Sequence, residues 1–388
     1  MERNAIKERA LAEVARQAEL LKGIAAELHA NPETGLQEYA AAALLADTLE
    51  RQGFVVERGL AGMATAFRAT YGEGSPAIAI LAEMDALPEL GHACGHNIIG
   101  AAAVGAALAL RHIFSPDAIR LVVFGTPAEE QGIGKVELIE QGAFKGIDFA
   151  MMVHPSARRT VTKFYLGLAK VRFTFSGKSA HAAAYPEEGI NALDGVIQTF
   201  NAINALRQQL RQDVRVHGVI TDGGVAPNII PARSSCYFYV RAEDLTMLQQ
   251  VKQQVISCAQ GAALATGCTL SVDEERRLLA PFRVNRPFAD LYAAQLAYLG
   301  LAEAQSPPDR GRGSSDIGNV SQVVPTIHPH VPMGDGIHIH TPGFAAAAGS
   351  QRGGEAVLEG ARTMALTAID LCLLEEWRRR ITDDEGLN

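Results

Sequence analysis

The sequence predicts an α/β fold in which a central mixed sheet is covered by helices and a smaller βαββαβ domain is inserted. Three observations predict it. Strand-like and helix-like segments alternate in residues 1–168 and again in residues 281–388, which favours a sheet covered on both faces. Residues 169–280 follow a different order, strand, helix, two strands, helix and strand, which can close into a small domain of its own. The length of 388 residues accommodates two such units.

In the first unit, periodicity predicts the helices and apolar runs predict the strands. An amphipathic helix ending near Pro32 is expected because apolar residues recur at steps of three and four: Leu11, Val14, Ala18, Leu21, Ala25 and Leu28. A second helix is expected over 37–52. The expected strands are 65–71, 77–84, 119–124 and 149–153, with an apolar helix after Gly100 and another helix over 136–142. Near the C-terminus, helices are expected over 288–298 and after Gly353.

The inserted domain is predicted in the same way. Strands are expected over 171–175, 214–221, 235–241 and 269–274, and helices over 189–210 and 245–265. The α/β pattern of the first unit resumes after Pro281. We therefore interpret residues 1–168 and 281–388 as one discontinuous domain and residues 169–280 as an insertion into it.

Composition and charge exclude several classes of function. The chain carries a formal net charge of −8 without a basic patch, so neither nucleic acid nor an anionic membrane is expected as its partner. Its five cysteines are odd in number and widely spaced, which is typical of a reducing compartment. The first residues lack the apolar core of a signal peptide, and the longest uncharged apolar stretch, 98–110, is shorter than the roughly 20 residues that span a bilayer. We expect a cytoplasmic location.

A first group of metal-ligand residue types follows the strand expected over 77–84. Glu83 and Asp85 are two residues apart, so they point the same way at the carboxyl end of that strand, where open α/β sheets place their sites. Cys94 and His96 follow in a loop before the next helix, and the single glycine between them lets both reach one cation. Either residue alone is more often a buried cysteine or a core histidine. Four ligand types in one short segment favour a metal.

Three further segments bring similar residues to strand ends or to the loops that follow them. Glu129 and Glu130 follow an apolar strand; because adjacent side chains on extended backbone diverge, one could bind metal while the other acts as a general base. Alone, this pair would be interpreted as an acidic turn or helix start. His154 ends another strand, and His338 and His340 are two residues apart. The convergence of these segments indicates a metal centre.

Four of these segments, EMDALPELGHACGHN, GTPAEEQG, MVHP and HIHTPGF, closely resemble the co-catalytic metallopeptidases and amidohydrolases that include carboxypeptidase G, the aminoacylases and the plant auxin-conjugate hydrolases. The GHACGHN form is similar to the branch that contains p-aminobenzoyl-glutamate hydrolase and the β-alanyl-lysine-type dipeptidase. The resemblance runs over nearly the whole chain, from LHANPETGLQEY through SGKSAHAAAYPEEGINALD to GSSDIGNVSQVVPTIHP. It implies an α/β catalytic domain, an inserted lid and dimerisation domain, and metal-dependent hydrolysis of an amide bond.

The resemblance also implies roles for individual residues. It implies two divalent ions per subunit, Zn²⁺ or Mn²⁺, held by five ligands: Cys94, His96, Glu130, His154 and His340. It implies that Glu129 is the general acid/base for a metal-activated water and that Asp85 orients a ligand. In the inserted domain, His181 matches a histidine that stabilises the oxyanion across a dimer interface. Asn228 and Arg241 match positions that hold the substrate's backbone or carboxylate.

The implied substrate is a dipeptide or an N-acyl or aminobenzoyl amino acid, and the implied assembly is a homodimer formed through the inserted domain. The motifs do not choose among these amides, because specificity depends on the shape of the pocket. Glu83 stands where many members of the family carry a metal-binding histidine, so ligation and support are both open to it. His92 and His338, each two residues from a stronger candidate, are open to either role as well.

Two other functions are compatible with the residues alone. A cysteine hydrolase would use Cys94 as nucleophile and His96 as base, although one intervening glycine orients such a pair poorly. A non-catalytic metal- or ligand-binding protein is the other alternative, and the presence of Glu129 beside Glu130 counts against it. Inhibition by chelators rather than by thiol alkylation distinguishes the metal-dependent hydrolase from the cysteine hydrolase.

Overall fold

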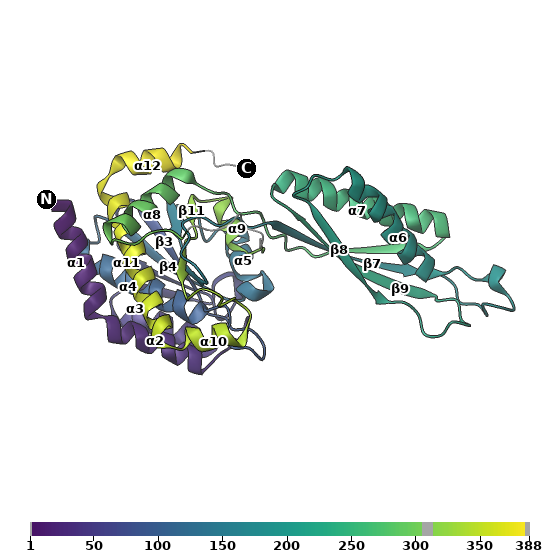
Figure 1. Ribbon diagram of the computed structural model, residues 1–388, viewed down its shortest axis with the longest axis horizontal. Coiled ribbons are helices and arrows are strands. Elements are labelled where there is room, and N and C mark those ends of the chain that lie inside the picture. The colour runs from purple at the N-terminus through teal and green to yellow at the C-terminus, as the bar shows by residue number, and fades with distance from the viewer. Residues whose placement is uncertain (1, 305–312, 385–388) are drawn as a thin grey trace. The chain divides into compact units, whose positions relative to one another are not determined.

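The computed structural model describes residues 2–304 and 313–384. The chain forms two compact units (Figure 1), which are described separately. The first unit contains the described residues up to Phe164 and from Arg283 onward, and the second is Tyr165–Phe282. Among the described residues, no helix is both long and apolar enough to cross a membrane.

A six-stranded mixed sheet forms the centre of the first unit, in the order β1-β2-β4-β3-β5-β11. Its strands are β1 (Val55–Arg58), β2 (Phe67–Tyr71), β3 (Ala77–Glu83), β4 (Arg120–Thr126), β5 (Phe149–Met151) and β11 (Thr326–Ile327). β1, β2 and β4 pair antiparallel, whereas β3 pairs in parallel with β4 and β5, and β5 with β11. A separate parallel pair joins β6 (His154–Ser156) to β12 (His330–Pro332). Every residue of β3 is buried, as expected for an apolar strand covered on both faces.

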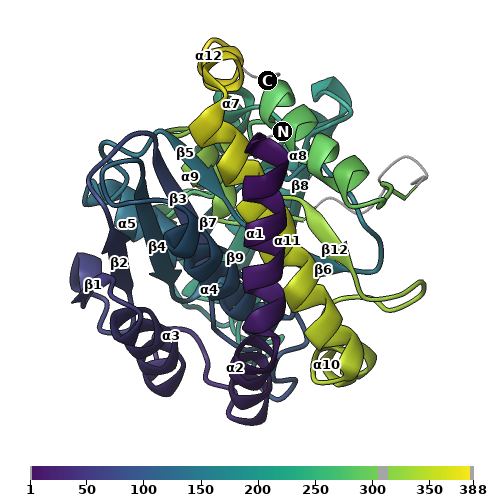
Figure 2. The same cartoon turned by 90° about the vertical axis from the view of Figure 1, so that its left-hand side faces the viewer.

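The helices of the first unit pack around α4 (His96–Ile113). The others are α1 (Glu2–Arg16), α2 (Ala18–Ala30), α3 (Tyr39–Arg51), α5 (Gly134–Glu140), α8 (Arg286–Tyr298), α9 (Ile317–Ser321), α10 (Pro342–Ala348), α11 (Gln351–Leu373) and α12 (Glu375–Thr382). α4 contacts α1, α2 and α11 (Figure 2) as well as β3 and β4. Gly105 of α4 makes this close packing possible, because a Cβ there would lie 2.7 Å from Leu21 and 2.9 Å from Ala361. The predicted α/β class, with a mixed sheet covered by helices, is confirmed.

The second unit is a four-stranded antiparallel sheet with two helices. Its elements are β7 (Gly167–Ser176), α6 (Ala192–Leu206), β8 (Arg215–Asp222), β9 (Arg233–Ala242), α7 (Leu245–Thr266) and β10 (Thr269–Glu274), and the strand order is β10-β7-β9-β8. Burial alternates along β7 and β9, which places Phe173 and Phe238 in a core with both helices. The predicted βαββαβ order is present.

Three helix boundaries differ from the sequence expectation. The first predicted helix is two helices, α1 and α2, which meet at Gln17. The final helix divides at Leu374 into α11 and α12. α4 begins at His96 rather than after Gly100, because Gly95, with φ 81°, turns the chain directly into the helix. His96 therefore lies in the first turn of a helix and not in a loop.

Candidate metal centre

The central sheet brings acidic side chains to one edge. Glu83, the last residue of β3, pairs in register with Thr126, the last residue of β4. Because these strands are parallel, their carboxyl ends lie at the same edge, where open α/β sheets bind ligands. Glu129 and Glu130 follow Thr126 in a short 3₁₀ helix, η2 (Glu129–Gln131). The expectation of extended backbone at these two glutamates is therefore wrong.

His96 presents one ring nitrogen to the site because its other nitrogen is bound. Nδ1 lies 2.9 Å from Asp85 Oδ1 and 2.8 Å from the Asp85 carbonyl oxygen, so Nδ1–H donates and Nε2 keeps its lone pair. Nε2 lies 3.3 Å from Glu83 Oε2 and 3.9 Å from Glu130 Oε1. Burial alone would lower the pKa of His96, but Asp85, Cys94 and Glu83 raise it well above its usual value. This position in the site therefore favours positive charge.

Cys94 and His154 form a second part of the site. The Cys94 Sγ lies 3.5 Å from His154 Nε2, while His154 Nδ1–H donates to the Pro155 carbonyl oxygen at 2.7 Å. Burial raises the pKa of Cys94 and lowers the pKa of His154 to about 4. The two groups are thus a neutral thiol and a neutral imidazole, and not the thiolate and imidazolium of a cysteine nucleophile. The ligand atoms of Cys94, His96 and His154 all lie within 4.8 Å of one another.

Glu130 and His340 complete the set of predicted ligands. His340 Nε2 lies 3.5 Å from Glu130 Oε1, and these two residues form a second group of donors with Cys94, again within 4.8 Å. Burial alone would raise the pKa of Glu130, but His340 and His96 lower it overall. His340 has the unusual φ of 63°, and its backbone N–H donates to the carbonyl oxygen of Ala93 at 2.8 Å. This bond holds His340 beside Cys94.

Three buried atoms facing this centre have no hydrogen-bond partner among the described residues: Glu83 Oε2, His96 Nε2 and Glu130 Oε1. All three are electron-pair donors. Leaving such atoms unsatisfied costs roughly 1–3 kcal/mol each, and a bound cation would satisfy them together. Thiol, imidazole and carboxylate donors are the ligand types that bind zinc and related divalent ions. The residues present therefore fit a divalent metal.

Glu129 lies on a turn that a remote carboxylate holds in place. Ala128, which precedes it, has φ 55°, a left-handed conformation that is uncommon outside glycine. Glu38, fully buried, accepts from the Ala128 N–H at 2.8 Å and from the Thr65 hydroxyl at 2.8 Å. Burial first, and then the carboxylates of Glu83 and Asp316, raise the pKa of Glu129 well above its usual value. Glu129 is thus a carboxyl group that readily holds a proton.

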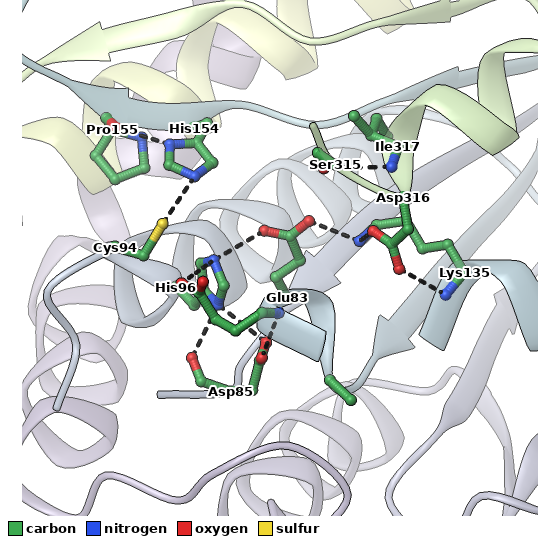
Figure 3. A network of polar contacts seen from close by, with 12 residues as sticks. Glu83, Asp85, Cys94, His96, Lys135, His154, Pro155, Ser315, Asp316 and Ile317 are labelled. Carbon is green, nitrogen blue, oxygen red and sulfur yellow. Dashed lines mark hydrogen bonds and ion pairs between the residues drawn. The ribbon is translucent and has the colours of Figure 1, made fainter. Parts of the chain in front are cut away.

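Sequence reasoning missed Glu38 and two further residues at this edge, Lys135 and Asp316. Lys135 is fully buried and its ammonium lies 2.6 Å from both Glu83 and Asp316 (Figure 3). These contacts join segments 52 and 181 residues apart in the sequence. Neither Lys135 nor Asp316 belongs to a spacing pattern that predicts a ligand. The apolar context of each residue was the one available signal, because a charged residue in an apolar segment needs a buried partner.

Two residues with an open role lie away from the donor groups. His92 is buried and its ring stacks on that of His29 with centroids 6.4 Å apart, and burial lowers the pKa of His92 to about 3. His338 is exposed in a turn, where its carbonyl oxygen accepts from the Thr341 hydroxyl at 2.7 Å. Among the described residues, neither belongs to a group of donors that could hold a metal.

The remaining predicted residues lie in the second unit. His181 and Asn228 are neighbours there: Ala182 N–H donates to the Asn228 carbonyl oxygen at 3.0 Å. His181 Nδ1 accepts from the backbone N–H groups of Ala183 and Ala184 at 3.3 and 3.1 Å, which leaves Nε2 of this exposed ring as the available donor. Arg241 lies on β9, with its guanidinium 6.0 Å from the centre of the Tyr239 ring. The structure thus brings His181 and Asn228 together and places Arg241 on a strand.

Gly95 is predicted to be indispensable for the geometry of the centre. A Cβ at this residue would lie 2.4 Å from Pro155 Cγ, and its φ is 81°. We expect Gly95→Ala to lose roughly 1–2 kcal/mol of unfolding free energy from the left-handed backbone alone, with more from the clash, and to weaken metal binding. Thermal unfolding and metal titration measure both. Gly261→Ala is the control, because that site on α7 is open and alanine favours a helix. Unchanged metal affinity in Gly95→Ala would contradict the prediction.

Comparison with known proteins agrees with this geometry. Residues 166–266 match the peptidase dimerisation domain family. The chain is 37% identical to the Xaa-Arg dipeptidase of Mus musculus, over 99% of this chain and 94% of that protein. It is 32% identical to a p-aminobenzoyl-glutamate hydrolase of Escherichia coli K12, over 73% of this chain and 63% of that protein. A dinuclear metal-binding peptidase of the M20 family from Bacillus subtilis has a similar fold, with a TM-score of 0.71, 19% identity and coverage of 92% of this chain and 98% of that one.

Fold, donor set and full-length similarity together define a metal-dependent hydrolase of amide or peptide C–N bonds. The chain belongs to the M20 peptidase family. The resemblance identified from the sequence motifs is thereby confirmed, and so is the prediction of a hydrolase.

Proposed function

We propose that this protein hydrolyses a dipeptide or an N-acyl or aminobenzoyl amino acid at a centre of two divalent ions, Zn²⁺ or Mn²⁺. The observation that supports the proposal most strongly is the set of overlapping donor groups. Cys94 belongs to one group with His96 and His154 and to another with Glu130 and His340. A sulfur atom common to two groups of donors suits a centre that holds two ions side by side.

When bound, two such ions would lower the pKa of a water molecule and polarise the amide carbonyl. The protein supplies the proton transfers. Glu129 accepts the proton of the attacking water and returns it to the leaving amine, a role suited to a carboxyl group whose pKa is raised by burial and by neighbouring carboxylates. Asp85 keeps Nδ1 of His96 protonated, so that Nε2 stays available to the metal.

The second unit supplies the groups that orient the substrate in this proposal. His181 donates through Nε2 to the oxyanion, whether from the same subunit or from a partner. Arg241 holds the substrate carboxylate, since a guanidinium binds carboxylates in a two-pronged geometry. Asn228 holds the backbone of the substrate through its amide. Residues 169–280 then act as lid and dimerisation domain for the catalytic domain of residues 1–168 and 281–388.

We propose dipeptides as the first substrate class to examine, because the full-length similarity is to a protein named Xaa-Arg dipeptidase. The test is a panel of dipeptides with basic, acidic and apolar C-terminal residues, together with aminobenzoyl-glutamate and N-acetyl amino acids, assayed by mass spectrometry with added Zn²⁺ or Mn²⁺. Cleavage of at least one dipeptide at its single peptide bond supports the proposal. Cleavage of none of these amides by metal-loaded protein would refute it.

We propose a homodimer formed through the second unit. β8 is an edge strand of its sheet and exposes Val219 and Ile220, which are 57% and 43% accessible. An exposed apolar edge strand pairs readily with another strand. We expect Val219→Lys combined with Ile220→Lys to convert a dimer into a monomer in light scattering coupled to size exclusion. Val55→Lys, on the edge strand β1 of the other sheet, is the control and should remain dimeric. A dimer that persists in the double variant would place the interface elsewhere.

A further inference from the structure

A buried ion network lies directly beside the donor groups. The Lys135 ammonium binds Glu83 Oε1 and Asp316 Oδ1, both at 2.6 Å, and the Lys135 backbone N–H donates to Asp316 Oδ2 at 3.0 Å (Figure 3). The side chains of Lys135, Glu83 and Asp316 are at most 1% exposed. Two carboxylates face one ammonium, so the network keeps one negative charge that is not balanced from within. A buried charge of this kind requires a further cationic partner.

The two carboxylates differ in what they leave available. Asp316 uses both oxygens on Lys135, one on the ammonium and one on the backbone N–H. Glu83 uses only Oε1, and its Oε2 has no hydrogen-bond partner among the described residues. The unbalanced charge of the network is therefore directed through Glu83 Oε2.

Glu83 Oε2 points at the nitrogen that is predicted to bind metal. It lies 3.3 Å from His96 Nε2, whose lone pair is free because Nδ1 is bound to Asp85. Two electron-pair donors at this distance repel each other unless a cation or a proton lies with them. The same cation that His96 binds would therefore be within reach of Glu83.

We propose that Glu83 is an additional ligand of the cation held by His96, through Oε2 alone, and that Lys135 is a positioning residue that reserves Oε1. This inference rests on the proposed metal centre and adds to it a residue outside the five predicted ligands. Lys135 fixes the direction of the Glu83 carboxylate and restricts it to one donor atom. Outer contacts of this kind hold metal ligands in their binding orientation.

The test is the affinity for Zn²⁺ alone, measured by competition with a chromophoric chelator, with bound metal counted by mass spectrometry. Glu83→Gln keeps the shape of the side chain and an acceptor for Lys135, but replaces the free donor oxygen by an amide NH₂. We expect its affinity for one ion to fall roughly 10- to 100-fold. Wild-type affinity in Glu83→Gln would overturn the assignment of Glu83 as a ligand.

The positioning role of Lys135 is tested by a double-mutant cycle. We expect Lys135→Met to weaken Zn²⁺ binding in the wild-type background and to have no further effect in the Glu83→Gln background, because it acts through Glu83. An absent effect in the wild type, or an equal effect in both backgrounds, would overturn this role. If Lys135→Met does not fold, the same cycle is run with Lys135→Gln, whose shorter amide can still hydrogen-bond Asp316.

Lys7 provides the matched control. It is the other buried lysine among the described residues of the first unit, and it binds Asp370 and Gln295 at 2.7 Å each. Lys7→Met removes a buried ion pair of the same kind without touching the donor groups, so Zn²⁺ affinity should be unchanged while stability falls. The wild type separates the two possible failures. If it binds no Zn²⁺, the proposed metal centre is wrong; if it binds Zn²⁺ and Glu83→Gln binds it equally well, only this inference is wrong.

Discussion

Replacing Glu129 by Gln is expected to lower kcat/KM by roughly 10²- to 10⁴-fold, the usual contribution of a general acid/base, while the metal content stays at the wild-type value. Glu129 carries the proton in the proposed mechanism, and an amide of the same shape cannot accept one. The fall should appear in kcat, with KM nearly unchanged, because Glu129 acts on the water and the leaving amine rather than on substrate binding. Steady-state kinetics with parallel metal analysis measures both quantities.

Glu57→Gln is a suitable control for this experiment. Glu57 is an exposed carboxylate of β1 that pairs with Arg68, so its replacement should leave kcat and metal content unchanged. If Glu129→Gln kept most of its activity with metals bound, Glu129 would not be the acid/base. Glu130 is not an alternative control, because its carboxylate is bonded to His340 and its loss should release metal.

Replacing Cys94 by Ser is expected to remove metal and activity together, with kcat/KM falling by roughly 100-fold or more. Cys94 is the donor shared by two groups, and a hydroxyl is a much poorer ligand than a thiolate for zinc-type ions. Metal content and kcat/KM should therefore fall in parallel. Excess metal should restore part of the activity of this variant, because the other donors remain.

This experiment also separates the metal-dependent hydrolase from a cysteine nucleophile. In the nucleophile hypothesis, Cys94→Ser would keep its metal and lose activity that no excess of metal restores. The structure favours the metal hypothesis, because burial raises the pKa of the Cys94 thiol in spite of the nearby His96 ring. Cys236→Ser is the control, since Cys236 is a buried free cysteine in the core of the second unit and its replacement should leave metal content unchanged.

The sequence predicts the elements well where apolar periodicity reports burial. β10 (Thr269–Glu274) and α7 are predicted nearly to the residue, because each has a clear pattern between turn residues. The start of α4 is missed because it depends on the conformation of Gly95, which lies before any apolar repeat. The break at Leu374 is missed for a similar reason, since apolar residues continue across it.

The site divides in the same way. Cys94 and His96 are visible in the sequence because soft and polar ligands stand close together after a strand. Glu38, Lys135 and Asp316 are invisible because each acts through a partner 52 to 181 residues away. Only the folded sheet brings such partners together, and a single charged residue in an apolar segment does not identify the residue that pairs with it.

The central claim is that hydrolysis depends on a two-ion centre built by this chain. It is tested most directly by titrating metal-free protein with Zn²⁺ or Mn²⁺ while measuring, in one series, bound metal per chain and the rate of cleavage of the best substrate from the panel. The account predicts no cleavage without metal and a rate that reaches its maximum at two ions per chain. Full activity in protein shown to contain no divalent metal would contradict it.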